Sequence, residues 1–150
     1  MTTLFLDLEK TIIHSWDDPI LINEERIINI IRSVNPSKIG IYSFAIYNKQ
    51  DLDIFQKTIL FALEGALHIN IQTDLIFTVE EIADTVLKTK KSDVRNFIQV
   101  YGKQRSFTEF IKEKYKEGNF VLIDDLVENK EISENNIRIQ LINPILKIAV

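Results

Sequence analysis

The chain reads LFLDLEKTII at positions 4–13, and this stretch decides how the rest is interpreted. An apolar run ends in Asp7, a second carboxylate follows at Glu9, and a threonine stands at Thr11. A short apolar run bounded by polar residues is typical of a strand buried on both faces of a sheet. Such a strand places Asp7 at its carboxyl end, where open α/β sheets bind ligands. Two acids so close together repel each other unless a cation or a substrate balances their charge. The stretch therefore predicts a functional site.

Length and composition limit the classes of protein that the chain can belong to. A chain of 150 residues with 45% hydrophobic and 27% charged residues is typical of one soluble globular domain, 1–150. The net charge of -4 argues against a general nucleic-acid binder, which shows a basic excess. The absence of cysteine excludes disulfides, thiolate metal sites and cysteine nucleophiles.

The sequence shows no targeting or membrane segment. The N-terminus lacks a basic segment followed by an apolar core, and no apolar run reaches the length of a membrane span. We therefore expect a cytoplasmic protein without a membrane partner. The tail 144–150 is apolar, so it packs either on the core or against a second copy in a homo-oligomer, and the sequence leaves both open.

Segments with apolar residues at helical spacing alternate with short apolar runs. Helices are predicted over Glu24–Val34, Gln50–Leu67, Val79–Leu87 and Ser106–Tyr115, and strands up to Asp7 and over Lys38–Ile46, Ile69–Phe77, Phe120–Ile123 and Ile137–Ile142. This alternation predicts right-handed βαβ units, hence an α/β fold in which a mostly parallel five-stranded sheet forms a three-layer α/β/α sandwich. The segment up to Asn136 that follows the fourth strand is polar and is predicted to be a loop. Asp93–Tyr101 fits either a helix or a strand, and Lys88–Lys91 is predicted to be a solvated helix end.

Particular residues are predicted to begin or end these helices. Asn23 is the expected N-cap of the first helix, and Thr78 caps the helix from Val79. Ser106 and Glu109 match the Ser-x-x-Glu pattern of a capping box. Gly118 is expected to end that last helix, because glycine is favoured just past a helix C-terminus.

Five polar residues are expected at one edge of the sheet. Asp7 ends the first strand, Ser43 lies near the end of the second, and Asp124 and Asp125 end the fourth. Lys103 precedes the helix that leads into the fourth strand. This order resembles the four motifs of the haloacid dehalogenase-like (HAD) superfamily, which are a nucleophilic aspartate, a serine or threonine, a lysine and an acidic pair. The resemblance covers nearly the whole chain and implies a HAD-like Rossmannoid fold.

The resemblance implies a chemical role for each acid. Asp7 is expected to attack phosphorus and form an aspartyl-phosphate, which divides one difficult hydrolysis into two easier steps. A carboxylate does not readily approach a phosphate dianion, so the resemblance also implies Mg²⁺. Its expected ligands are the oxygens of Asp7, Asp124 and Asp125 and the backbone carbonyl of Glu9.

The same resemblance assigns the remaining positions. Ser43 would hold the transferring phosphoryl group, and Lys103 would neutralise charge between that group and the carboxylates. Glu9 occupies the position of the residue that protonates the leaving group and then activates water. The family usually has aspartate there, and glutamate reaches about one carbon–carbon bond further. Misplacement of about 1 Å can cost on the order of 10²-fold in rate, so glutamate at this position bears directly on activity.

Spacing excludes a full cap domain, since Asp7 and Ser43 are only 36 positions apart and core elements fill the interval from Ser43 to Lys103. Two functions follow from the resemblance. The first is a small Mg²⁺-dependent phosphatase acting on a phosphorylated substrate. The second is a catalytically weak binding or scaffolding module, favoured by Glu9 and by apolar Leu60 and Phe61. A phospho-receiver domain uses similar residues, but its acidic pair follows the first strand.

Overall fold

The computed structural model describes residues 1–88 and 94–145, which form one mixed sheet of six strands. The order across the sheet is β3-β2-β1-β4-β6-β5, so the first strand of the chain lies in the interior. The five strands from β3 to β6 are parallel, and β5 pairs antiparallel with β6 at the edge. The strands are β1 Thr2–Leu6, β2 Lys38–Tyr42, β3 Ile76–Phe77, β4 Gly118–Ile123, β5 Lys130–Glu134 and β6 Ile137–Ile142.

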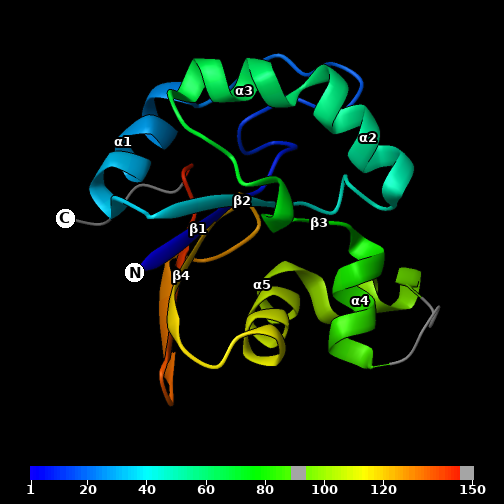
Figure 1. The fold of residues 1–150 in the computed structure, drawn as a ribbon, viewed down its shortest axis with the longest axis vertical. Helices are drawn as coiled ribbons and strands as arrows, with labels where there is room; N and C mark the ends of the chain where they lie inside the picture. Colours follow the sequence, from blue (N-terminus) through cyan, green and yellow to red (C-terminus); the bar gives the residue numbers. More distant parts are fainter. Residues whose placement is uncertain (89–93, 146–150) are drawn as a thin grey trace.

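Helices cover both faces of the sheet. Figure 1 shows α1, α2 and α3 on one side of the strands and α4 and α5 on the other. Two separate hydrophobic clusters lie beneath these two groups of helices. The helices are α1 Glu24–Val34, α2 Lys49–Thr58, α3 Leu60–Leu67, α4 Val79–Leu87 and α5 Val94–Lys114, with a short 3-10 turn η1 at Thr73–Leu75. None of the described helices is long and apolar enough to cross a membrane.

Strand β1 is buried on both faces, as predicted. Leu4 and Leu6 belong to the cluster under α1, α2 and α3, whereas Phe5 points into the opposite cluster. There the ring of Phe5 packs edge-on against Phe107, with the ring centroids 5.7 Å apart. Because side chains alternate along a strand, Asp7 faces the same side as Phe5, which is the side covered by α5.

Strand β2 passes close to the η1 turn at Gly40. A Cβ atom at position 40 would overlap the carbonyl oxygen of Leu75 and lie 2.6 Å from the Leu75 Cβ. Glycine is therefore required where the chain returns toward β3. This close approach fixes how β3 is placed against β2, and so orders that edge of the sheet.

The prediction of five strands was wrong, because the predicted polar loop contains β5. This strand is polar since it forms an edge with one face open, and Ile132 alone of its residues packs on the hydrophobic cluster. A turn at Asn135, which has a φ of 53°, joins it to β6. Because most side chains of this edge strand are exposed to solvent, its sequence contains too few apolar residues to predict a strand.

Several other predicted elements have different bounds. The strand predicted over Lys38–Ile46 ends at Tyr42. The helix predicted over Gln50–Leu67 is divided at Ile59 into α2 and α3. The strand predicted over Ile69–Phe77 is shortened to β3, because the η1 turn occupies the residues before it. The predicted helices α1 and α4 have the bounds that their apolar spacing indicated.

Residues 94–101 are helical, which resolves the choice between helix and strand for the described part of that segment. The helix α5 is interrupted at Gly102, whose φ of 66° and ψ of -173° are not helical. The predicted capping box was wrong, because the second segment begins at this kink and Ser106 lies within it. Gly118 does not end the helix but begins β4.

The caps that were predicted elsewhere give mixed results. Thr78 caps α4, since its hydroxyl accepts a hydrogen bond from the Glu81 N–H. Asn23 precedes α1, but its side chain donates to the carbonyl oxygen of Thr11 and does not cap the helix. The predictions for 89–91 and for 146–150 fall outside the described residues, as does Asp93.

Candidate functional site

The register of the sheet brings Asp7 and Asp124 to the same level on neighbouring strands. Leu6 pairs with Ile123, so the two aspartates follow directly after a matched pair. The Asp7 N–H donates to the Ile123 carbonyl at 3.0 Å and extends the ladder by one step. The two carboxylates therefore lie together at the carboxyl ends of β1 and β4, as the sequence predicted.

Lys103 joins the two aspartates from the helix above them. Its Nζ lies 2.8 Å from Asp7 Oδ1 and 3.0 Å from Asp124 Oδ2. The exposed fractions of these side chains are 4% for the lysine, 6% for Asp7 and 0% for Asp124. Lys103 follows the kink at Gly102, so the first turn of the second segment of α5 directs it toward the sheet. Three charges are thus held together almost without access to solvent.

Burial and charge together shift the pKa values of this cluster. Burial alone would lower the pKa of Lys103, but the charges of Asp7 and Asp124 outweigh it and raise that pKa. Burial raises the pKa of Asp124 to about 7 against the attraction of Lys103, and the charge of Asp7 adds to the rise. Burial and the charge of Asp7 likewise raise the pKa of Asp125. The positive charge of Lys103 therefore neutralises the negative charge of the three aspartates only in part.

Thr11 connects the two acidic segments and was not among the predicted site residues, although it stands in the opening motif. Its Oγ lies 2.9 Å from Asp7 Oδ2 and 3.1 Å from Asp125 Oδ1, and it accepts a hydrogen bond from the Asp125 N–H. A hydroxyl has one proton, so it donates to one of the two carboxylates at a time. The available signal in the sequence was the position of this threonine, four residues after Asp7 in the opening motif.

The three aspartates fit a divalent cation. One oxygen from each of Asp7, Asp124 and Asp125 lies within 4.8 Å of the others. Asp124 Oδ2 is buried and has no hydrogen bond within residues 1–88 and 94–145. Lys103 Nζ is 3.0 Å from this oxygen, but the angles of the contact are not those of a hydrogen bond. Carboxylate oxygens are the ligands that Mg²⁺ prefers, and an added cation would balance the remaining negative charge.

Asn143 supports the acidic loop from the end of β6, and the sequence contained no pattern that pointed to it. Its amide donates to the carbonyl oxygens of Asp125 at 3.0 Å and Val127 at 2.9 Å. Its own N–H donates to Asn129 Oδ1 at 2.8 Å. The loop after β4 is therefore held to the neighbouring strand, which keeps Asp125 beside Asp7.

Aromatic side chains surround Lys103. Its Nζ lies 4.6 Å from the centre of the Phe44 ring and 5.7 Å from that of Tyr42. The buried Tyr42 hydroxyl forms a 2.8 Å hydrogen bond with Ser106 Oγ, which donates to the Lys103 carbonyl. Burial raises the pKa of Tyr42, which keeps this phenol neutral. These contacts fix the start of the helical segment that presents Lys103.

Ser43 and Glu9 have other partners than the acidic cluster. Ser43 is buried directly after β2, and its Oγ accepts a hydrogen bond from the Ala45 N–H at 3.1 Å. The Glu9 carboxylate accepts a hydrogen bond from the Trp16 N–H at 2.7 Å. The structure thus brings together Asp7, Lys103, Asp124 and Asp125, and directs the Glu9 side chain toward the loop that follows β1.

No protein-family model, curated protein sequence or solved structure matches this chain.

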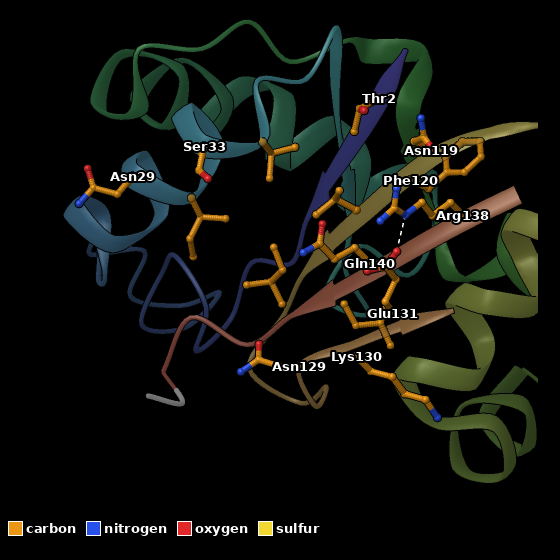
Figure 2. Close-up of a pocket in the computed structure, with 15 residues that line it drawn as sticks. Thr2, Asn29, Ser33, Asn119, Phe120, Asn129, Lys130, Glu131, Arg138 and Gln140 are labelled. Atoms are coloured by element: carbon orange, nitrogen blue, oxygen red, sulfur yellow. Dashed lines mark hydrogen bonds and ion pairs between the residues drawn. The ribbon is translucent and has the colours of Figure 1, made fainter. Parts of the chain in front are cut away.

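Two pockets were compared with this cluster. A groove of about 820 Å³ runs along α1 and the open face of β4, β6 and β5 (Figure 2). Apolar side chains, amides, hydroxyls and the surface ion pair between Arg138 and Glu131 line it, and none of the clustered acids does. A pocket of about 470 Å³ adjoins Lys103 and is also lined by Tyr101, Arg105 and Leu126. The acidic cluster is the candidate functional site, because charged groups converge there.

Proposed function

We propose that the protein is a small Mg²⁺-dependent phosphatase with a HAD-like, three-layer α/β/α fold and no full cap domain. The observation that supports this most strongly is the contact of Lys103 with both Asp7 and Asp124 at the carboxyl ends of adjacent parallel strands. With Asp125, three carboxylates lie around the one ammonium group of Lys103. A buried group with unbalanced negative charge stabilises a fold poorly and favours a ligand with positive charge.

Asp7 is the proposed nucleophile. Its Oδ1 is held by Lys103 and its Oδ2 by Thr11, so the carboxylate has a fixed direction before a substrate arrives. Asp7, Asp124 and Asp125 would hold the Mg²⁺, which when bound would polarise the phosphoryl oxygens. Attack by Asp7 forms the bond to phosphorus as the bond to the leaving group breaks, and water then hydrolyses the aspartyl-phosphate.

Lys103 and Ser43 would stabilise the transferring phosphoryl group. The ammonium group of Lys103 is already beside Asp7 Oδ1, so it would lie close to the oxygens of the phosphoryl group that Asp7 attacks. Ser43 ends the strand next to β1, and its hydroxyl would donate to a phosphoryl oxygen. The pocket beside Lys103, with Leu126 71% exposed at its rim, would accept the leaving group.

A catalytically weak binding or scaffolding module is the second candidate. The hydrogen bond between Glu9 and the Trp16 N–H favours it, because the carboxylate that would perform proton transfer is engaged elsewhere. Phe61, which is 79% exposed on α3, offers an apolar contact for a partner, whereas Leu60, which the sequence suggested for the same surface, is buried in the core. Isolation of the protein with a bound partner, and without phosphatase activity, would support this reading.

The deciding experiment is a phosphatase screen with and without Mg²⁺ on the wild type and Asp7→Asn. Asparagine keeps the shape of the side chain, so the variant should remain folded but lose hydrolysis of an aryl phosphate. The far-ultraviolet circular dichroism of both proteins provides the control for folding. Unchanged turnover in Asp7→Asn would exclude Asp7 as the nucleophile.

A further inference from the structure

Glu9 forms a specific contact that its expected role in proton transfer does not explain. Its Oε2 lies 2.7 Å from the backbone N of Trp16, seven positions further along the chain. The contact is a hydrogen bond to a charged acceptor, which is stronger than one between neutral groups. The Glu9 side chain therefore has a defined partner in the loop that follows β1.

That loop is a closed hairpin, which we call the 13–21 hairpin. Ile13 and Leu21 form an antiparallel bridge at its base, and the His14 N–H donates to the Ile20 carbonyl at 2.8 Å. Near its tip, the N–H groups of Ser15 and Asp18 each donate to the carbonyl of the other residue. These hydrogen bonds lie within the hairpin, whereas the Ile13 N–H at its base donates to the Leu8 carbonyl and the Trp16 N–H donates to the Glu9 carboxylate.

The Trp16 side chain holds the hairpin from a second direction. It is partly buried and packs against the hydrophobic cluster under α1, α2 and α3. Rotation of the Glu9 carboxylate away from Trp16 would leave the Trp16 N–H without its acceptor while the indole stays packed. The contact is part-buried, so a backbone N–H that loses this acceptor has to find another partner or water, and the rotation is unfavourable.

We propose that Glu9 holds the 13–21 hairpin through Trp16 and is a positioning residue, so that phospho-Asp7 is long-lived and its hydrolysis limits turnover. This inference rests on the proposed function. The additional methylene of glutamate is what allows the contact, since an aspartate at position 9 would end about one carbon–carbon bond, or about 1.5 Å, short of Trp16.

The two chemical steps depend differently on such a residue. In the first, an Asp7 oxygen bonds to phosphorus and the leaving-group oxygen departs with its electron pair. An aryl oxide leaves without receiving a proton, so this step does not need an acid. In the second, water attacks phosphorus, the bond from phosphorus to Asp7 breaks, and the water proton must be accepted by a base. With Glu9 bound to Trp16, bulk water accepts that proton, and the second step is slow.

The test is rapid mixing of the full chain with para-nitrophenyl phosphate and Mg²⁺, followed by acid quench and intact-mass measurement. We expect a burst of about one nitrophenolate per protein, then slow release, and a protein mass increased by one phosphoryl group that is absent in Asp7→Asn. Steady release without a phosphorylated protein would overturn the inference and leave the proposed function standing. If neither nitrophenolate nor phosphorylated protein is formed, the proposed function is overturned, and the inference with it.

Two substitutions at position 9 separate positioning from proton transfer. Glu9→Asp releases the carboxylate from Trp16 and should increase the decay rate of the phosphoprotein at least about tenfold, since a positioned base contributes about 10²–10⁴-fold. Glu9→Gln keeps an oxygen acceptor for the Trp16 N–H but cannot accept a proton, so its phosphoprotein should decay at the wild-type rate. A decay about tenfold or more slower in Glu9→Gln would show that Glu9 is the base, and would overturn the inference.

Discussion

Lys103 Nζ lies 2.8 Å from Asp7 Oδ1, although the two residues are 96 positions apart in the chain. The helix that presents the lysine and the strand that ends in the aspartate meet only because β1 and β4 are neighbours in the sheet. Since both side chains are almost fully buried, this contact affects the stability of the fold as well as the candidate site.

Replacement of Lys103 by methionine should destabilise the protein strongly in the absence of divalent cations. The variant leaves Asp7 and Asp124 buried without a counter-charge, and removal of one partner of a buried ion pair costs about 3–5 kcal/mol. Urea unfolding with excess chelator measures the loss. Lys112→Met, which breaks the half-exposed contact with Glu134, should change the free energy of unfolding by less than about 1 kcal/mol. Equal losses in the two variants would contradict the prediction.

Substitution of Asp124 by asparagine should remove the stabilisation that Mg²⁺ confers. A ligand at a concentration of about 100 times its Kd stabilises the native state by about 2.7 kcal/mol. Asp124 provides a buried oxygen that has no hydrogen bond to any residue that the structure describes. Thermal unfolding with and without Mg²⁺ should show a rise in Tm for the wild type and for Asp84→Asn, an exposed aspartate of α4. A full rise in Asp124→Asn would place the cation elsewhere.

Asn143→Ala should weaken Mg²⁺ binding although Asn143 is not an expected ligand. Its amide holds the carbonyl groups of Asp125 and Val127, and loss of groups that orient ligands typically reduces metal affinity about 10–100-fold. Calorimetric titration with Mg²⁺ measures the change. Asn136→Ala, at an exposed turn, is the matched control and should bind as the wild type does. Retained affinity in Asn143→Ala would show that the loop after β4 needs no such support.

Gly40→Ala tests the fold and not the site. The new methyl group would overlap the carbonyl oxygen of Leu75, and overpacking of this kind costs about 1–3 kcal/mol. Gly65→Ala is the control, since no atom of the described part of the chain lies within 4 Å of a Cβ at that position in α3. Alanine is favoured over glycine in helices by about 0.5–1 kcal/mol. Chemical denaturation should therefore shift the two variants in opposite directions. A stable Gly40→Ala protein would contradict the described contact between β2 and η1.

The sequence predicted some helices and strands more accurately than others. Apolar spacing predicted α1 and α4 with their bounds, because one face of each helix packs on the core. It missed β5, because only Ile132 of that edge strand reaches the core. It also misplaced the start of the helix around Ser106, because the kink at Gly102 depends on a glycine with positive φ and not on a cap.

By itself the sequence determined which residues end buried strands, and hence that Asp7, Asp124 and Asp125 meet at one edge of the sheet. That inference succeeds because strand burial and side-chain alternation are local properties of a few consecutive residues. Only the tertiary structure decided which side chains these residues contact. Lys103 lies between two aspartates, Asn143 holds the loop that carries Asp125, and the Trp16 N–H donates a hydrogen bond to Glu9. Side-chain partners depend on strand order and on the course of loops, which contacts between distant segments determine.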